Sequence, residues 1–294
     1  MNGTLYLCAT PIGNLDDMTF RAINTLREVD VIAAEDTRRT RKLLTHFDIH
    51  TPLIRFDENC KATVAEKILQ RLQAGESVAV VSDAGLPAIC DPGTDLVRLA
   101  IDAGITVSPI PGANAALSAL ICSGLDTTKF LFAGFPPKTK KNRREFLQKL
   151  STLDTTIIFY EAPHRLKSFL DELTEIFGQR RATLARELTK VHEEFLRGEL
   201  PTLAEKISEL RGEFVIIVDG AALLKSAQTV DASNVTTTAT DSPRPDVESI
   251  FSVVKKFMDT GLDKKSAMRE AAKLFNVSRR EIYNALIKDS EVTQ

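Results

Sequence analysis

The stretch that most constrains the fold of this chain runs from Val78 to Gly93. It begins with the short β-branched run Val78–Val81, which predicts a buried strand. Polar residues, glycines and prolines follow this strand, and an apolar pattern of helical spacing begins only after Gly93. Because loops between a strand and a helix are usually about 2–6 residues long, this longer loop predicts a ligand site. The alternative is an ordinary connection between a strand and a helix.

Strands and helical patterns alternate along residues 1–123, which predicts an N-terminal α/β domain with a parallel sheet. Residues 124–224 contain further strands and helices in a less regular order, which indicates a second α/β domain with a mixed sheet. The fold class expected is therefore α/β, with two such domains.

The C-terminal part has a different composition. Eight of the 20 residues from Ser226 to Pro245 are Ser or Thr and none is aromatic, so residues 225–246 are expected to form a flexible linker. Residues 247–294 read as a small all-α module. Within it, Lys265–Leu286 has the pattern of a helix-turn-helix, with Ala272, Asn276 and Ile282 at the small, turn and core positions. A small helical bundle without a ligand is the alternative.

Charge and cysteine content exclude several classes of protein. The net charge of −2 means that any contact with nucleic acid must come from local patches. The four cysteines are scattered without a C-x-x-C pair, which argues against a metal site and against a disulfide framework. No apolar run reaches the roughly 18 residues that a membrane span needs. These features favour a cytoplasmic protein with neither metal nor membrane.

Two basic patches stand out within this acidic chain. From Lys138 to Lys149 there are six Lys or Arg residues and one Glu, a local net charge of +5. A second cluster comprises Arg38, Arg39, Arg41 and Lys42. Either patch is suited to contact phosphates of a nucleic acid, although such runs are often only solvated faces.

Several predicted strands end in loops rich in Pro, Gly or charged residues, and in a parallel sheet such loops gather at one edge. These loops are Thr10–Asn14, Glu35–Arg38, Ser82–Gly93, Pro111–Asn114, Glu161–Arg165 and Arg186–Lys190. Their number predicts a cleft between two domains. The chain lacks the P-loop pattern, the G-x-G-x-x-G pattern and the G-x-S-x-G elbow, so ordinary nucleotide sites and hydrolase sites are not expected.

Five of these motifs, in order, resemble those of the bacterial ribosomal RNA 2′-O-methyltransferases, a family within the tetrapyrrole methylase superfamily. They are Ala9–Leu15, Ala34–Arg38, Ser82–Gly85, Phe159–Arg165 and Ala185–Lys190. The resemblance covers roughly Leu5–Asp219. It implies two α/β domains of the tetrapyrrole methylase type, with S-adenosylmethionine (SAM) in the cleft between them, and a homodimer. It also implies 2′-O-methylation of a cytidine ribose in the decoding region of 16S ribosomal RNA, within the small ribosomal subunit.

The resemblance also assigns residues to the cofactor. The family's cofactor loops fall on Pro11, Ala84, Gly85, Leu86, Ile89, Asn114, Ala115, Glu161 and Leu188. The sequence departs from the family pattern at Leu86, Cys90 and Ala113–Asn114, where the family usually carries Thr, Ser and Pro-Ser respectively. Hydroxyl groups that could bond the cofactor are therefore absent. The Asn114 side chain can still both donate and accept hydrogen bonds.

The candidate catalytic residues are Asp36, Arg38 and His164. Asp36, Glu161 and His164 are candidates for a general base near the ribose hydroxyl. His164 follows Pro163, which favours the first turn of a helix, and a helix N-terminus disfavours the imidazolium form. The alternatives are that His164 only caps this helix and that Asp36 only forms a salt bridge with Arg38 or Arg39.

Two rival functions are compatible with the same sequence. The first is a tetrapyrrole C-methyltransferase, which would share the fold but act on a small molecule. The second is a DNA-binding regulator in which the α/β part senses a ligand and the helix-turn-helix binds duplex DNA. The basic run and the C-terminal helices argue against the first rival.

Overall fold

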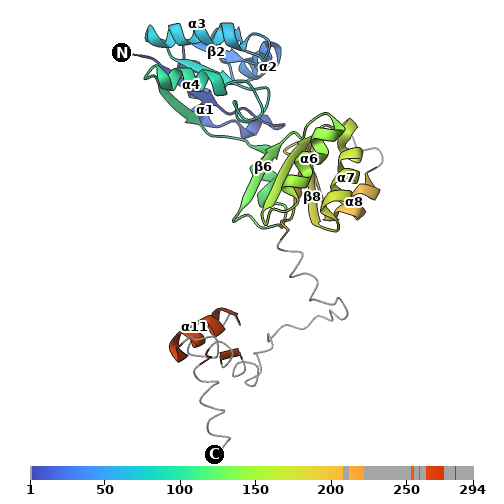
Figure 1. Ribbon diagram of the computed structural model, residues 1–294. Helices are drawn as coiled ribbons and strands as arrows, with labels where there is room; N and C mark the ends of the chain where they lie inside the picture. Colours follow the sequence, from blue (N-terminus) through green and yellow to red (C-terminus); the bar gives the residue numbers. More distant parts are fainter. Residues whose placement is uncertain are drawn as a thin grey trace, which may run out of the picture. The chain divides into compact units, whose positions relative to one another are not determined.

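The computed structural model describes residues 2–207, 212–221, 253–254, 258, 263–274 and 282. The chain divides into two compact units, Met1–Asp231 and Ala232–Gln294. The first unit contains two five-stranded sheets with helices around them (Figure 1). The predicted linker and most of the predicted helical module lie outside the described residues.

The first sheet is parallel throughout, as predicted. Its strands are β1 (Thr4–Cys8), β2 (Val31–Ala34), β3 (Leu53–Arg55), β4 (Val78–Val81) and β5 (Thr106–Ile110). Their order is β3-β2-β4-β1-β5, so β2, β4 and β1 are central. Every residue of β2 and β4 is buried, which explains why these segments are continuous apolar runs rather than alternating ones.

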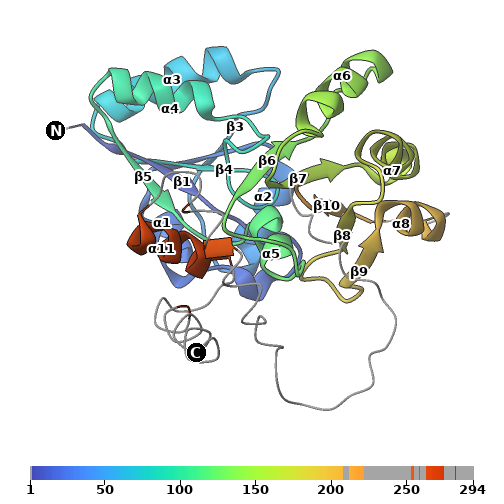
Figure 2. The ribbon, with the colours of Figure 1, turned by 60° about the horizontal axis from the view of Figure 1, so that its bottom comes forward.

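Helices cover both faces of this sheet (Figure 2). They are α1 (Phe20–Glu28) and α2 (Thr37–His46) on one face, and α3 (Lys61–Gln73) and α4 (Thr94–Asp102) on the other. A short 3₁₀ helix, Leu15–Asp17, precedes α1. Thr19 and Asp36 accept hydrogen bonds from the first turns of α1 and α2 respectively, which fixes where these helices begin.

The second sheet is mixed, as predicted from the less regular order of strands and helices in this part of the sequence. Its strands are β6 (Phe130–Gly134), β7 (Thr156–Glu161), β8 (Arg181–Arg186), β9 (Glu194–Glu199) and β10 (Phe214–Val218). Their order is β6-β7-β10-β8-β9, and only β6 and β7 run parallel.

One face of the second sheet packs against three helices. They are α6 (Lys140–Leu150), α7 (Pro163–Phe177) and α8 (Leu200–Lys206). Phe159 of β7 and Phe169 of α7 are both fully buried, and their rings meet edge to face with centroids 5.4 Å apart. Helix α8 has Pro201 in its first turn, a position that favours proline.

Helix α5 (Ala115–Ile121) packs on the opposite face of the second sheet, although it follows β5 of the first. Ala116, Ala119 and Leu120 of α5 are buried together with Ile158 and Ile217. The chain therefore crosses to the second sheet before residue 124, and α5 lies beside the loops that end β7 and β8.

In the second unit, α11 (Lys264–Leu274) is described together with a few neighbouring residues. Ala267, Met268, Ala271 and Ala272 of α11 are buried in one apolar cluster with Val254 and Ile282. Ala272 and Ile282, which the sequence predicts at the small and core positions of the helix-turn-helix, both lie in this cluster. Asn276 and the predicted second helix of the helix-turn-helix lie outside the described residues, apart from Ile282.

Candidate functional site

A cavity of about 380 Å³ lies where loops from both sheets meet. This volume falls within the roughly 300–1,000 Å³ of pockets that hold small molecules. The lining residues are Ile12, Ala84, Gly85, Leu86, Ile89, Cys90, Asp91, Asn114, Ala115, Phe135, Tyr160, Glu161, Ala162, Pro163, Leu188, Glu213, Phe214 and Val215. The predicted cofactor residues thus converge on this cavity, with Ile12 lining it in place of the neighbouring Pro11.

Two apolar side chains of the lining are held by strained backbone. Ile89 lies between Ala88 (φ 66°) and Cys90 (φ 63°), and Leu188 lies between Glu187 (φ 48°) and Thr189 (φ 66°). Non-glycine residues in the left-handed region are unfavourable and persist where surrounding contacts enforce them. Strain of this kind on both sides of one cavity makes the cavity a candidate functional site.

The contacts that enforce the strain around Leu188 are polar. Lys190 Nζ lies 3.1 Å from Glu187 Oε1 and 3.0 Å from Glu213 Oε2, and the Thr189 amide donates to Glu193. The Thr189 hydroxyl also accepts a hydrogen bond from the Asn14 amide at 3.0 Å. This last bond joins a loop of the first sheet to a loop of the second beside the cavity.

The start of α5 presents polar groups to the cavity. Asn114 Oδ1 accepts from the Leu117 amide at 2.9 Å and so caps the helix, while Tyr160 Oη accepts from the Ala116 amide at 3.1 Å. Burial raises the pKa of Tyr160 to about 12, so this phenol stays protonated. The Asn114 amide group and the Tyr160 hydroxyl proton can therefore both donate to a ligand.

The charged residues of the lining are all acidic. Asp91, Glu161 and Glu213 line the cavity, and no Lys or Arg does so within the described part of the chain. Glu161 is almost fully buried, and its Oε1 accepts from the Ala162 amide and from Arg165 Nε. The lining thus combines apolar surface with three carboxylates, of which Glu161 pairs with Arg165 and Glu213 pairs with Lys190.

Asp91 is one of several lining residues that were not predicted as site residues, as are Phe135, Tyr160 and Glu213. Burial, together with the negative charges of Glu35 and Asp83, raises the pKa of Asp91 to about 6. The pKa of Glu35 is raised as well, by burial and then by the charge of Asp83. Asp91 lies within Val78–Gly93, and its position between Cys90 and Pro92 was the available signal.

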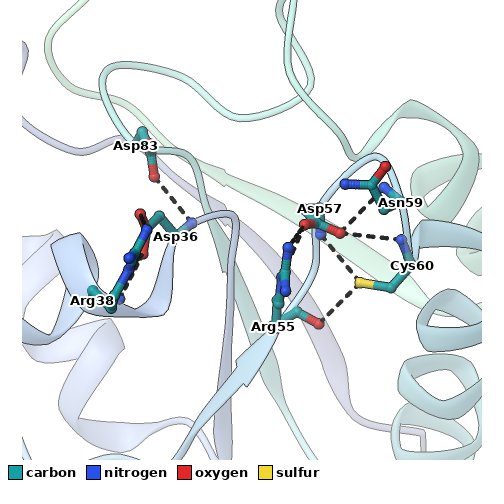
Figure 3. A network of polar contacts seen from close by, with 7 residues as sticks. All are labelled: Asp36, Arg38, Arg55, Asp57, Asn59, Cys60 and Asp83. Carbon is teal, nitrogen blue, oxygen red and sulfur yellow. Dashed lines mark hydrogen bonds and ion pairs between the residues drawn. The ribbon is translucent and has the colours of Figure 1, made fainter.

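The predicted catalytic residues Asp36 and Arg38 are not among the residues that line the cavity. They pair with each other next to Asp83 (Figure 3). Asp36 Oδ1 accepts from the Arg38 amide, and both carboxylate oxygens bind the Arg38 guanidinium. Hydrogen bonds from Arg38 hold the pKa of Asp36 well below its usual range. Asp83 accepts a hydrogen bond from the Asp36 amide at 3.0 Å and pairs with Arg39 at 3.3 Å. Asp36 thus forms the salt bridge with Arg38 that the sequence analysis gave as an alternative.

A second polar cluster follows β3 and was not predicted (Figure 3). Asp57 accepts from the amides of Asn59 and Cys60 and from Arg55 Nε at 2.8 Å. Hydrogen bonds from Cys60 and Arg55 lower the pKa of Asp57 to about 2. These bonds hold in place the loop that follows β3, which is an edge strand of the first sheet.

His164 is the second residue of α7 and is exposed, and it does not line the cavity although Pro163 does. The first residue before this helix is Ala162, and no side chain caps it. The alternative that His164 only caps α7 is therefore not supported.

Part of the basic run on α6 forms ion pairs within the protein. Arg143 makes two hydrogen bonds of 2.7 Å to Glu172 of α7, and this ion pair is nearly buried. Arg144 binds both carboxylate oxygens of Glu175. Two of the six cations thus join α6 to α7, and the lysines of the run remain exposed.

Within the described residues, no group of His, Cys, Asp and Glu side chains is arranged to hold a metal ion. None of the described helices is both long enough and apolar enough to cross a membrane.

The chain is similar to known proteins over most of its length. Residues 4–204 match the family model for tetrapyrrole (corrin/porphyrin) methylases. The ribosomal RNA small subunit methyltransferase I of Halalkalibacterium halodurans is 48% identical over 286 residues, covering 96% of this chain and 94% of that protein. The Bacillus subtilis protein of the same name is 45% identical over 291 residues, with the same shares of both chains.

Among solved structures, a uroporphyrin-III C-methyl transferase from Thermus thermophilus complexed with S-adenyl homocysteine superposes with a TM-score of 0.55. It is 16% identical and covers 76% of this chain and all of that one. At this identity the likeness shows the fold alone.

Proposed function

The chain belongs to the tetrapyrrole methylase family, and we propose that it is a SAM-dependent methyltransferase acting on a cytidine ribose 2′-oxygen in 16S ribosomal RNA. Two proteins named as small-subunit ribosomal RNA methyltransferases match 96% of this chain, which supports ribosomal RNA as the acceptor. The observation that carries the proposal is the acid-lined cavity between loops of both sheets.

The cavity residues are suited to hold SAM. Ala84, Gly85 and Ala115 keep side chains small where a ligand would lie against main chain, while Leu86, Ile89 and Leu188 supply apolar contact. Gly85 also has φ 80°, and its backbone exchanges two hydrogen bonds with Thr10, so a larger residue would disturb the loop itself. Asn114 and Glu161 supply polar contacts. Pro11 does not line the cavity, and its proposed role is to position Ile12, which does.

When bound, SAM supplies a methyl group on an electrophilic sulfonium, so the protein's main task is positioning. Asp91 is suited to accept the proton of the ribose hydroxyl, because it lines the cavity and its pKa of about 6 lies near neutral pH. Asp36 acts as a positioning residue that orients Arg38. Arg38 and His164 contact the RNA at the edge of the cavity.

The rival functions receive less support. A tetrapyrrole C-methyltransferase shares the fold, as the Thermus structure illustrates, but the relatives at 45–48% identity carry a ribosomal RNA name. The same relatives also carry no name of a DNA-binding regulator, so their names favour the methyltransferase over this second rival.

We further propose that the chain acts in the cytoplasm as a homodimer. Leu117 and Ile121 lie one turn apart on α5 and expose 46% and 75% of their surface. In the proposed homodimer, a second copy of this chain would cover the exposed apolar side chains of Leu117 and Ile121. Ile121→Asp should then shift the protein toward the monomer in sedimentation, while Lys149→Asp on α6 should not.

The test of the function is transfer of labelled methyl groups from SAM to small ribosomal subunits from cells that lack the activity. The RNA chain should resist alkaline cleavage on the 3′ side of one labelled cytidine. A 2′-O-methyl group removes the 2′-hydroxyl that would otherwise attack the adjacent phosphate. Label on the base instead of the ribose, or no transfer to subunits or to naked RNA, would contradict the proposal.

A further inference from the structure

One face of α2 carries a row of cations beside the cavity. Arg38, Arg41, Lys42 and Thr45 line a hollow on the surface, and their spacing of three, four and seven residues places them along one side of the helix. Thr40 and Leu44 lie on the buried side of the helix. The row spans about 10 Å along the helix axis.

The cations near the start of α2 do not stabilise the helix. Arg38 and Arg39 occupy the first turn of α2, which contains no acidic residue, whereas a helix N-terminus favours anions. Asp36 and Asp83 partly offset these two charges. Arg41 and Lys42 are exposed and form no ion pair with any residue that the structure describes.

Arg38 is held ready for an anion. Its Nε and Nη2 donate to Asp36 at 3.1 and 2.9 Å, which orients the guanidinium while 86% of the side chain stays exposed. Its Nη1 donates no hydrogen bond within the described part of the chain. Guanidinium groups oriented in this way suit phosphate oxygens.

The row begins at the edge of the cavity. Asp83, which binds the amide of Asp36, directly precedes the cavity residue Ala84. An RNA strand whose target nucleotide enters the cavity would therefore place neighbouring phosphates over the first turn of α2.

We propose that the face of α2 formed by Arg38, Arg41, Lys42 and Thr45 binds backbone phosphates of the RNA strand next to the target nucleotide. This inference rests on the proposed function. It assigns the phosphate contacts to α2 in preference to the longer basic run on α6, because the start of α2 is bound to Asp83, next to the cavity residue Ala84. On α6, Arg143 and Arg144 are bound to Glu172 and Glu175.

The test compares two double variants of the full-length protein that remove the same charge. Arg41→Ala with Lys42→Ala acts on α2, and Lys140→Ala with Lys141→Ala acts on the exposed first turn of α6. Binding to transcribed 16S ribosomal RNA and to purified small subunits is measured over a range of salt concentrations, without SAM. The SAM-induced rise in melting temperature is recorded as a check on the cavity.

The α2 variant should bind RNA roughly tenfold more weakly, and the slope of log affinity against log salt should fall by about 1.4 to 2. The α6 variant should keep both the affinity and the slope of the wild type, and both variants should keep the SAM response. An unchanged slope in the α2 variant, or an equal loss in both variants, would overturn the inference. A loss confined to assembled subunits would also overturn it, since the contact would then be to a ribosomal protein. Wild-type protein that binds RNA but transfers no methyl group would contradict the proposed function alone.

Discussion

Helices α2 and α6 have nearly the same kind of sequence, but their cations have different surroundings. On α6, Arg143 and Arg144 bind acids of α7, and the Arg143–Glu172 pair has about one tenth of each side chain exposed. On α2, Arg41 and Lys42 are exposed and line the surface hollow on this helix. A basic run therefore indicates a phosphate-binding surface only when the partners of its charges are known. On α6 the two arginines join two helices, whereas on α2 Arg41 and Lys42 are available to a ligand.

The largest expected difference between the two helices is in stability. Arg143→Ala leaves the nearly buried Glu172 carboxylate without its partner and should lower the free energy of unfolding by about 2 kcal/mol. Arg41→Ala on α2 should change it by less than about 0.5 kcal/mol. Urea denaturation of both variants measures the difference, and equal losses would contradict this assignment of roles.

A second prediction extends the contrast between paired and unpaired charges to two aspartates. Asp36, paired with Arg38, has a lowered pKa, whereas Asp91 has a pKa raised to about 6 by burial and acidic neighbours. Because the folded state holds the Asp91 proton more tightly than the unfolded state, stability falls as the pH rises from about 4 to 6. Asp91→Asn should remove this loss and stabilise the protein at pH 7 by about 1 kcal/mol, after allowance for partial exposure.

The control for Asp91→Asn is the same measurement at about pH 3, below the pKa of Asp91 in both the folded and the unfolded state, where the side chain is neutral in both and the difference should vanish. Methyl transfer should fall in the variant although the protein is more stable. A variant that is less stable than the wild type at pH 7 would argue against a raised pKa in the folded state.

The smallest expected effect is on the exposed pair of α6. Arg144 and Glu175 expose 41% and 57% of their side chains, so water and salt weaken their interaction. Arg144→Ala should therefore lower the melting temperature much less than Arg143→Ala, and the difference from wild type should shrink in 0.5 M salt. An Arg144→Ala effect as large as that of Arg143→Ala would show that exposure does not control the strength of these pairs.

The sequence was sufficient for most of the fold because the central strands are unbroken apolar runs. The runs at β4 and β10 and the helix α7 are each bounded by turn residues or by a first-turn proline. Strand β3 was missed because it has three residues and lies at the sheet edge, where no periodicity can develop. The placement of α5 was also not foreseen, since its packing on the second sheet depends on tertiary contacts.

The candidate site was predictable where local motifs carry the signal. Ala84–Leu86 and Leu188 lie in loops that the sequence marks by small or charged residues after strands. Glu213–Val215 also line the cavity, but they enter it through the position of β10 between β7 and β8, which no local pattern shows. The Arg143–Glu172 pair joins residues 29 positions apart, so composition alone made α6 look like the stronger phosphate site.

The most direct test of the central claim is a kinetic separation of the two surfaces during methyl transfer to small ribosomal subunits. Ile89→Ala removes an apolar contact of the cavity at a side chain that is 39% exposed, so the fold should tolerate it. It should raise the KM for SAM about fivefold, in keeping with the loss of roughly 1 kcal/mol of apolar contact, and leave the KM for RNA unchanged. Arg41→Ala with Lys42→Ala should raise the KM for RNA about tenfold and leave the KM for SAM unchanged. If both variants raised the same KM, or if the wild-type protein transferred no methyl group, the account of an acid-lined donor cavity beside a phosphate-binding α2 would be contradicted.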